Sequence, residues 1–377
     1  MTTPSYLGTL SRALRGAGVD RPCVVIDLDA VDHNIQALKQ LADPALNWRL
    51  VAKSLPCLPL LSYIGTQIGS PDVMTFSAQM LDVLLRDAER RDHLIGKPIP
   101  VTAAAAVLQA HPGAVEQVQW LVDTETRLEE YARLASETGQ KLRVSLEIDV
   151  GLHRGGFAPE EVGRVVDQIA THGGLQLSGV MGYEAHLAKM PGFLRAAAAR
   201  RTDQALETVA RALPENGAGL CINSGGSMTF ERYRRQRIVN DISFGSILVQ
   251  PSDFSGATRQ QFRPAAFIAT PVLKAMPENL IPGLERVTFL RKRHMNIAIH
   301  GGHYLANPVH PTGFKYSGMF GRSSNQEVWT GPAGANIGPG DIALLLPTQS
   351  EAVLSQFGSL ITVRTESVCD TWDCLPG

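Results

Sequence analysis

The sequence predicts an α/β fold, a (β/α)8 barrel of the TIM type followed by a second, mostly β domain. Strand-like apolar runs alternate with segments of helical spacing over about 200 residues, which is the pattern of such a barrel. The alternation stops near residue 250, where Gly and Pro become dense. The competing architecture, a doubly wound sheet, lacks support because the chain has no glycine-rich dinucleotide fingerprint. A length of 377 residues also exceeds the usual size of one domain.

A β-then-α unit opens the chain, ahead of the strands assigned to the barrel. The apolar run from Cys23 to Ile26 predicts a strand, and Asp29 is a suitable N-cap for the helix after it. One face of that helix carries the apolar residues Val31, Ile35, Leu38 and Leu41. Because this strand has no place in the barrel, we expect it to pair with the β-rich domain.

Eight strand-like runs follow, and the first of them ends in Lys53. They lie at 47–53, 72–76, 99–105, 118–122, 142–149, 176–182, 219–223 and 238–243. Between them, residues such as Leu128, Tyr131, Leu134 and Ala135 recur at helical spacing, as does the alanine- and arginine-rich stretch 193–213. We therefore expect the barrel to occupy residues 44–249.

The rest of the sequence predicts a discontinuous β-rich domain made of residues 1–43 and 250–377. Helical periodicity fades there, and turns alternate with short β-branched runs such as 342–346 and 360–363. The five cysteines do not form a disulfide framework in a chain of this length.

Composition excludes several classes of function. The formal net charge is −1 and the pI is near 6.8, and no stretch interleaves many basic residues with aromatics, which argues against nucleic acid as a partner. The N-terminal residues lack a basic region followed by an apolar run, and no long uncharged apolar segment occurs. These features predict a soluble, cytoplasmic protein without a membrane partner.

Lys53 stands at the carboxyl end of the first barrel strand, the rim where parallel α/β barrels gather their chemistry. A partly desolvated lysine at such a rim has a nucleophilic amine suited to a Schiff base. The plainer alternative is a strand-end lysine that points into solvent.

Glycines and serines follow the seventh and eighth strands. The run Asn223-Ser224-Gly225-Gly226-Ser227 comes after the seventh, and Gly245-Ser246 after the eighth. Glycines let backbone N–H groups approach an anion, serines add hydroxyl donors, and these two loops form the recurrent phosphate site of such barrels. A simple turn is the alternative.

The fifth and sixth strands end in aromatic, cationic and imidazole groups, namely Arg154 after the fifth and Tyr183 and His186 after the sixth. Each also has a plain structural explanation, since Arg154 can pair with Asp149 and His186 can cap a helix. Together with a lysine after strand one and an anion site after strand seven, they are what a pyridoxal phosphate site needs.

Several motifs resemble those of a known family. Asp27-Leu28-Asp29-Ala30-Val31-Asp32-His33-Asn34-Ile35 and Val51-Ala52-Lys53 resemble the beginning of the fold-type III pyridoxal phosphate enzymes, the alanine racemase group. Gly151-Leu152-His153-Arg154-Gly155, Gly182-Tyr183-Glu184-Ala185-His186 and Ser224-Gly225-Gly226-Ser227 are similar to the branch with D-threonine aldolase, D-serine dehydratase and 3-hydroxy-D-aspartate aldolase. The resemblance extends from about residue 20 to residue 365.

The resemblance implies roles for these residues. Lys53 would form the Schiff base and return as the base at Cα, and Arg154 and Tyr183 would lie close to the cofactor with His186 as a polar neighbour. The implied phosphate ligands are Ser224, Gly225, Gly226, Ser227, Gly245 and Ser246, next to Asn223. Family members are commonly homodimers whose sites lie between the barrel of one subunit and the β domain of the other.

The chain departs from this branch at the position of a divalent metal. The relatives bind it through a His and a Cys or Asp two residues later, where this chain has Gln349 and Glu351. An amide is a poor ligand, so retro-aldol cleavage and β-elimination lose their usual metal. His300, His303 and His310 are possible replacements, and a metal-free substrate contact by Gln349 and Glu351 is another.

The sequence as a whole predicts a pyridoxal phosphate-dependent lyase of the D-threonine aldolase type, acting on a D- or β-hydroxy amino acid through Lys53. The alternatives are an amino-acid racemase or a metal-free dehydratase, and, from another class, a non-catalytic carrier of pyridoxal phosphate.

Overall fold

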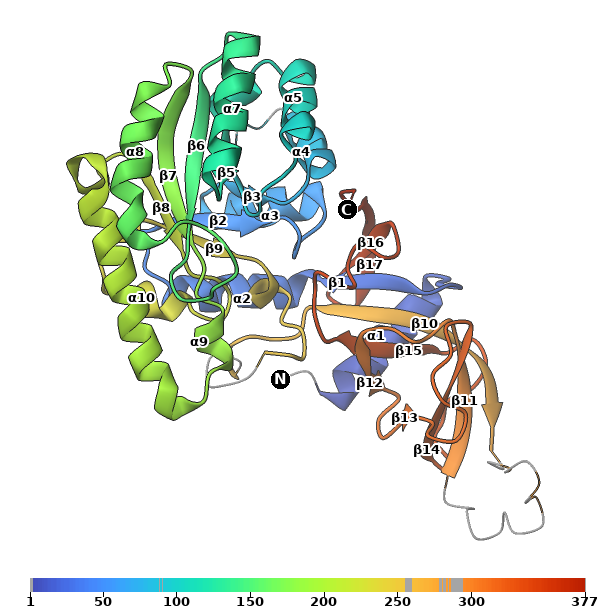
Figure 1. Ribbon diagram of the computed structural model, residues 1–377. Helices are drawn as coiled ribbons and strands as arrows, with labels where there is room; N and C mark the ends of the chain where they lie inside the picture. Colours follow the sequence, from blue (N-terminus) through green and yellow to red (C-terminus); the bar gives the residue numbers. More distant parts are fainter. Residues whose placement is uncertain are drawn as a thin grey trace. The chain divides into compact units, whose positions relative to one another are not determined.

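The computed structural model describes residues 3–87, 89, 91–254, 260–277, 280, 283, 285 and 294–376. The chain divides into two compact units (Figure 1). Unit 1 consists of residues 1–37 and 246–374, and unit 2 of residues 38–245 and 375–377.

Unit 2 is a closed barrel of eight parallel strands. The strands are β2 (Asn47–Val51), β3 (Val73–Thr75), β4 (His93–Ile95), β5 (Val118–Val122), β6 (Leu142–Ile148), β7 (Leu175–Gly182), β8 (Cys221–Ser224) and β9 (Asp241–Phe244). The last strand returns to the first, with Asn47 opposite Asp241 and Leu50 opposite Phe244. The predicted (β/α)8 barrel is therefore confirmed.

The third barrel strand is not where the sequence predicted it. Residues 99–105 read as a strand, but Val101–Ala110 form helix α5, and the third strand is the three-residue β4. Alanine has the highest intrinsic helix propensity, and residues 103–106 are all alanine. A buried strand as short as β4 leaves little periodic signal in the sequence.

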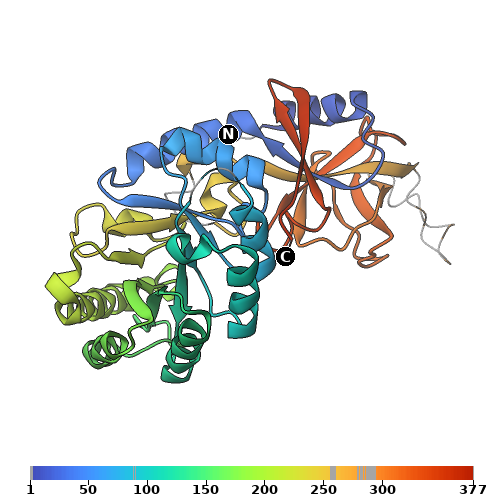
Figure 2. The ribbon, with the colours of Figure 1, turned by 90° about the horizontal axis from the view of Figure 1, so that it is seen from above.

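Helices surround the strands of unit 2, as the blue, green and yellow parts of Figures 1 and 2 show. They are α3 (Leu58–Ile68), α4 (Ala78–Leu85), α5, α6 (Ala114–Gln117), α7 (Glu125–Thr138), α8 (Val162–Thr171), α9 (His186–Lys189) and α10 (Gly192–Ala212). Short 3-10 turns are η1 (Pro159–Glu161), η2 (Pro214–Gly217) and η3 (Phe230–Tyr233). In α7 the buried residues are Leu128, Tyr131, Leu134 and Ala135, the predicted apolar face.

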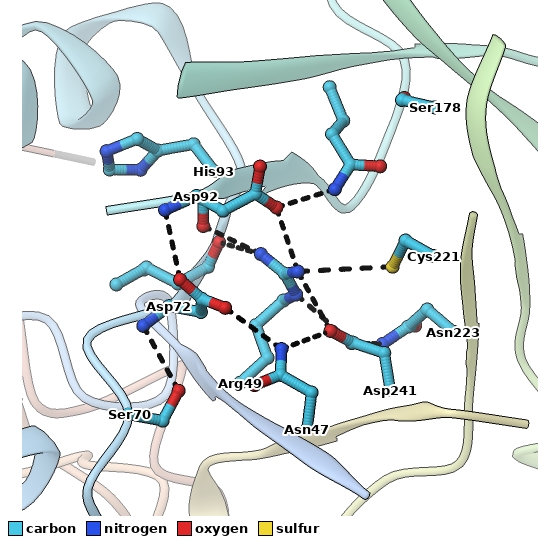
Figure 3. A network of polar contacts seen from close by, with 12 residues as sticks. Asn47, Arg49, Ser70, Asp72, Asp92, His93, Ser178, Cys221, Asn223 and Asp241 are labelled. Atoms are coloured by element: carbon cyan, nitrogen blue, oxygen red, sulfur yellow. Dashed lines mark hydrogen bonds and ion pairs between the residues drawn. The ribbon is translucent and has the colours of Figure 1, made fainter. Parts of the chain in front are cut away.

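A buried ion network lies where the barrel strands begin (Figure 3). Arg49 on β2 is 1% exposed, and its guanidinium donates twice to the carboxylate of Asp241, at 3.1 and 2.8 Å. It also donates to a carboxylate oxygen of Asp92 at 2.9 Å. Arg143 completes the charge balance by donating to the other Asp92 oxygen at 2.7 Å. Two cations and two carboxylates thus neutralise one another inside this end of the barrel.

Unit 1 is built on a nine-stranded sheet. Its strands are β1 (Cys23–Asp27), β10 (Ala266–Met276), β11 (His294–His300), β12 (Ala306–His310), β13 (Lys315–Tyr316), β14 (Gln326–Pro332), β15 (Ile342–Pro347), β16 (Ser359–Arg364) and β17 (Ser367–Asp373). The first strand, β1, pairs antiparallel with β10 and parallel with β16, which agrees with its predicted pairing in the β-rich region.

Helix α1 (Pro4–Gly16) covers one apolar face of this sheet with Leu7, Leu10 and Leu14. These leucines share a core with sheet residues such as Phe267 and Leu344. Helix α2 (Leu28–Leu41) begins two residues earlier than an N-cap at Asp29 predicts. Its N-terminal N–H groups are capped by Asp27, whose carboxylate accepts from Asp29 and Ala30, so Asp27 and not Asp29 acts as the cap.

The last described residues of the chain belong to the barrel unit. The backbone N–H of Leu375 donates to the carbonyl oxygen of Pro56 at 2.7 Å, and the Leu375 side chain is buried. All five cysteines are free thiols. Within the described ranges, no helix combines the length and apolar composition needed to cross a bilayer.

Candidate functional site

Lys53 follows β2 at the carboxyl end of the barrel strands, and its side chain is exposed. Its ammonium nitrogen lies 4.7 Å from the ring centroid of Phe76, which follows the neighbouring strand β3. The flanking residues Ala52 and Ser54 are buried, so a rigid backbone presents the amine at the rim. This geometry combines an accessible amine with a fixed point of attachment.

Gly245, directly after β9, packs against the strand end that carries Lys53. A Cβ at this glycine would lie 2.8 Å from Cβ of Val51 and 2.7 Å from Cβ of Ser54, a space that only glycine fits without a shift. The N–H of Gly245 donates to Oγ of Ser227 at 3.2 Å. The pairing of β2 with β9 therefore joins the lysine strand to the serine- and glycine-rich loop after β8.

Tyr183 and Arg154 stack on the other side of that loop. The tyrosine follows β7 and is 39% exposed, and a Cβ at Gly226 would lie 3.1 Å from its Cε2 atom. The Arg154 guanidinium lies 5.7 Å from the Tyr183 ring centroid, within the range of a cation–π contact. Burial raises the pKa of Glu147 on β6, and the nearby charge of Arg154 opposes that shift.

Six of the predicted site residues are thereby linked in a continuous series around the rim. Arg154 stacks on Tyr183, Tyr183 packs on Gly226, and Gly226 precedes Ser227 in the chain. Ser227 in turn binds Gly245, which packs beside Lys53. Ser246 begins the 3-10 turn η4 (Ser246–Leu248) immediately after Gly245.

A buried acidic cluster lies beneath the loop, and the sequence did not single it out. Glu184 is fully buried, and one of its carboxylate oxygens accepts from Ser224 Oγ at 2.9 Å and from the Gly225 N–H at 3.2 Å. Tyr233 on η3 lies 3.0 Å from the same Ser224 hydroxyl. Burial and the nearby Glu184 charge raise the pKa of the Tyr233 phenol. Alternation along the strand end was the available signal, because Glu184 and Tyr183 must point to opposite sides.

Asn223 lies apart from the rim residues. Its amide donates to Asp241 at 2.5 Å and to Ser243 Oγ at 2.9 Å, which occupies both N–H donors. The residue is 1% exposed and joins the Arg49 network in Figure 3. The structure therefore places Asn223 inside the barrel, although it is adjacent to the loop in sequence.

His186 starts helix α9 and packs near Gly151, where a Cβ would lie 3.4 Å from its Nε2 atom. Burial lowers the pKa of His186, and the nearby Glu184 charge opposes the shift. The plainer alternative, in which Arg154 pairs with Asp149, does not match the ion pairs of the described residues. Asp149 accepts from Nδ1 of His153 at 2.7 Å, which leaves Arg154 for the tyrosine ring.

Gln349 and Glu351 lie in unit 1, after strand β15, and both are exposed. The Gln349 amide nitrogen donates to Asp253 at 3.4 Å, and Glu351 accepts from Ser350 Oγ at 3.2 Å. Among the described residues, no group of three or more His, Cys, Asp or Glu side chains is arranged to hold a metal ion. An amide that donates to a carboxylate does not fit the metal site that the resemblance implied.

The possible replacement ligands His300, His303 and His310 also belong to no such group among the described residues. His300 ends β11, and His303 is exposed in the following turn with φ of 57°. His310 faces helix α1, where a Cβ at Gly8 would lie 3.8 Å from its Cε1 atom. Burial lowers the pKa of His310.

The chain is similar in sequence to a curated protein over part of its length. The alanine racemase of Mycolicibacterium smegmatis is 24% identical over 165 residues, which cover 43% of this chain and 41% of that racemase. The chain thus matches about two fifths of the length of this curated relative.

Three solved structures share the fold over nearly the whole chain. D-threonine aldolase from Filomicrobium marinum has a TM-score of 0.76 and 19% identity, covering 94% of this chain and 96% of its own. D-threo-3-hydroxyaspartate dehydratase from Delftia sp. HT23 has a TM-score of 0.74 and 19% identity, and the match covers 95% of this chain and 98% of that protein. Alanine racemase from Clostridium difficile 630 has a TM-score of 0.73 and 16% identity, and the match covers 93% of this chain and 98% of that protein.

A family model described as "Alanine racemase, N-terminal domain" matches residues 26–252, which include the whole barrel and every rim residue described above. The match covers more than half of the chain. The chain therefore belongs to the alanine racemase family, the fold-type III group of pyridoxal phosphate enzymes that its motifs predicted.

Proposed function

We propose that this protein is a pyridoxal phosphate-dependent lyase of the D-threonine aldolase type that acts on a small D- or β-hydroxy amino acid. The observation that carries the proposal is the series around the barrel rim. It brings an exposed lysine amine, a glycine- and serine-rich loop and a stacked Arg–Tyr pair to one end of one barrel.

The rim residues fit the cofactor. A Cβ at Gly245 would clash with Val51 and Ser54, and one at Gly226 would lie 3.1 Å from the Tyr183 ring, so both positions favour glycine in a turn of the kind that binds phosphate. The hydroxyl oxygens of Ser227 and Thr229 accept from the backbone N–H groups of Gly245 and Gly226, and the Thr229 hydroxyl can donate its proton to an anion. Lys53, joined to this loop through Gly245, would hold the cofactor through its amine. Pyridoxal phosphate, when bound, supplies an electron sink for the bond broken at Cα.

The surrounding side chains have separate tasks in this proposal. Released from the cofactor by the substrate amine, Lys53 moves a proton at Cα. Arg154 and Tyr183, stacked beside the loop, orient the ring and flank the substrate. His186 follows Glu184 by two residues and offers an imidazole whose pKa burial lowers, so it is a neutral hydrogen-bonding group near neutral pH.

The choice of reaction depends on the region of Gln349. The lyase reading is supported by the likeness to D-threonine aldolase and by the Gly182–His186 motif. Since Gln349 and Glu351 do not fit a metal, no step is assigned to one. Racemisation and metal-free dehydration are the alternative reactions, because inversion at Cα needs no activation of a β-hydroxyl. The carrier alternative is disfavoured by the nine-stranded sheet of unit 1, which such proteins lack.

A cofactor test comes first. The purified protein with added pyridoxal phosphate should show the visible band of a lysine-bound cofactor, and borohydride reduction should fix a pyridoxyl group on the peptide with Lys53. The variant Lys53→Ala should lose both signals. Lack of the band in the wild-type protein at saturating cofactor would remove the enzyme and carrier readings together.

A substrate test then separates the reactions. The holoenzyme is incubated with the D- and L-forms of threonine, serine and alanine, each with and without Mg²⁺, Mn²⁺ or Zn²⁺. Aldehyde release indicates an aldolase, keto acid with ammonia a dehydratase, and inversion alone a racemase. No turnover of any of them would favour the carrier. The proposed homodimer is checked by the molar mass of the holoenzyme from light scattering.

A further inference from the structure

The donors of the loop at Ser224–Thr229 are divided between two directions. Glu184, below the loop, takes the Ser224 hydroxyl and the Gly225 N–H with a single carboxylate oxygen. The next backbone donor, the Gly226 N–H, does not bind Glu184 but donates to Oγ1 of Thr229 at 3.1 Å. The first half of the loop is therefore committed to a side chain of the protein itself.

The proton positions in this cluster follow from the chemistry of the groups. The Glu184 oxygen that meets Ser224 acts as an acceptor, so the single hydroxyl proton of Ser224 must point toward it. The Tyr233 hydroxyl lies 3.0 Å from Ser224 Oγ and can donate to it. Ser224 is 0% exposed and has no proton left for an anion. Its predicted role as a phosphate donor does not agree with this geometry.

Ser227 and Thr229 have the opposite arrangement. Each hydroxyl oxygen accepts a backbone N–H, from Gly245 and from Gly226. Accepting a hydrogen bond strengthens a hydroxyl as a donor, because chains of hydrogen bonds polarise one another. Both residues are half-buried, whereas Ser224 is fully buried, so their hydroxyls lie nearer to an incoming ligand.

Glu184 is also held in one place. Gly225 has φ of 81°, a conformation that favours glycine, and a Cβ there would lie 2.9 Å from Cε2 of Tyr233. The other carboxylate oxygen of Glu184 is buried and has no hydrogen-bond partner among the described residues. A fully buried carboxylate with one empty oxygen is costly, so its two donors on the loop are what keeps it there.

We infer that Glu184 is a positioning residue that holds Ser224 and Gly225 away from the anion, and that Thr229 supplies a hydroxyl donor for the phosphate of the cofactor. The inference rests on the proposed function, because it names the donors of that same site. Thr229 is thereby proposed as a binding residue. The sequence motif did not point to it, because it lies outside Ser224–Ser227.

The test compares pyridoxal phosphate with pyridoxal, which lacks the phosphate. Dissociation constants of both are measured on the apoprotein by the visible band, and their ratio isolates the phosphate contacts. Thr229→Val should weaken pyridoxal phosphate binding about tenfold and leave pyridoxal binding unchanged, because a hydrogen bond to a charged group is lost. Thr229→Ser keeps the hydroxyl and should restore the wild-type ratio. Ser224→Ala should change the ratio less than about threefold.

Glu184 is tested with two variants of similar size. Glu184→Gln keeps an oxygen for Ser224 and Gly225 and places its amide at the position that has no partner, so the ratio should stay near the wild-type value. Glu184→Met has no acceptor and should weaken pyridoxal phosphate binding about tenfold relative to pyridoxal. If Glu184→Met does not fold, the Thr229 and Ser224 variants decide the matter.

Two results would overturn the inference: a larger change of the ratio in Ser224→Ala than in Thr229→Val, or a wild-type ratio in Glu184→Met. Failure of the proposed function has a different signature, since the wild-type protein would then show no band with either compound.

Discussion

The two ends of the barrel treat charged groups in opposite ways. Where the strands begin, Arg49 and Asp241 are both almost completely buried, and their charges are matched within the network of Figure 3. Where the strands end, Lys53 and Arg154 are exposed and rest on the faces of Phe76 and Tyr183. An aromatic face attracts a cation without neutralising it, whereas a carboxylate pair does neutralise it.

The difference separates stability from chemistry within one domain. Buried charges that pair with each other are not available to a ligand. Removing one member of such a pair leaves the other buried and unpaired. Lys53 and Arg154 are exposed, so a ligand can reach them. Buried ion pairs at one end of the barrel thus contrast with accessible cations at the other.

The largest expected effect is at Lys53. Lys53→Ala should lower turnover roughly 10³-fold or more, because the nucleophile and proton carrier are lost together. The free energy of unfolding should change by less than about 0.5 kcal/mol, since the side chain is exposed. Turnover assays and urea denaturation measure the two quantities. Lys97→Ala, another exposed lysine, is the matched control and should leave turnover unchanged.

Arg49→Met should act on stability instead. Removing a buried cation that pairs with Asp241 and Asp92 leaves carboxylates uncompensated, so we expect a loss of about 3–5 kcal/mol in the free energy of unfolding. The double variant Arg49→Met with Asp241→Asn should recover part of that loss. Urea denaturation measures both variants. If the free energy of unfolding of Arg49→Met lay within about 1 kcal/mol of the wild-type value, the proposed division between the two ends would be contradicted.

Gly245→Ala tests whether backbone packing holds the reactive end together. The new Cβ would lie within 2.8 Å of Val51 and 2.7 Å of Ser54, so we expect a destabilisation of about 1–3 kcal/mol and weaker cofactor binding. Gly173→Ala is the control, because nothing lies within 4 Å of its Cβ position. Equal unfolding midpoints for the two variants would show that the contact has no energetic weight.

The smallest effect concerns pH and His93, at the start of β4. Burial holds the pKa of His93 at about 3 in the folded protein, against an ordinary value of 6.5. Between these pH values the unfolded chain binds a proton that the folded chain does not, so the free energy of unfolding falls as pH is lowered. The slope for this site is at most about 1.4 kcal/mol per pH unit.

His93→Gln should flatten the pH dependence of stability between about pH 6 and pH 4. Urea denaturation at several pH values measures the slope. The nearby Asp92 has a pKa lowered below its usual value, with burial opposing the effect of Arg49, so its contribution is lost only at a pH below about 4. An unchanged slope in the variant would assign the acid sensitivity to other groups.

Much of the barrel was predictable because periodicity reports which side of an element is buried. The face of α7 follows that rule. Strands β5 to β7 are mostly buried along their length and match apolar runs of the sequence. The failure at 99–105 came from a three-residue strand beside an alanine run, where helix propensity and apolar character look alike. Asp27 replaced Asp29 as a cap because the strand and the helix adjoin without a loop.

The site shows a similar limit. Lys53, Tyr183 and Arg154 stand at strand ends, so counting strands predicted that they share a rim. The contacts of Glu184 with Ser224 and of Asn223 with Asp241 connect residues that are far apart in sequence, and only the closed barrel brings them together. Which hydroxyl faces a ligand is decided by such contacts and not by a motif.

The hydrogen bond from Leu375 to Pro56 has a consequence for the reactive end of the barrel. Pro56 lies three residues after Lys53, and its carbonyl oxygen accepts from the backbone N–H of Leu375 at 2.7 Å. A change at Leu375 that removes this donor therefore acts on the turn beside Lys53.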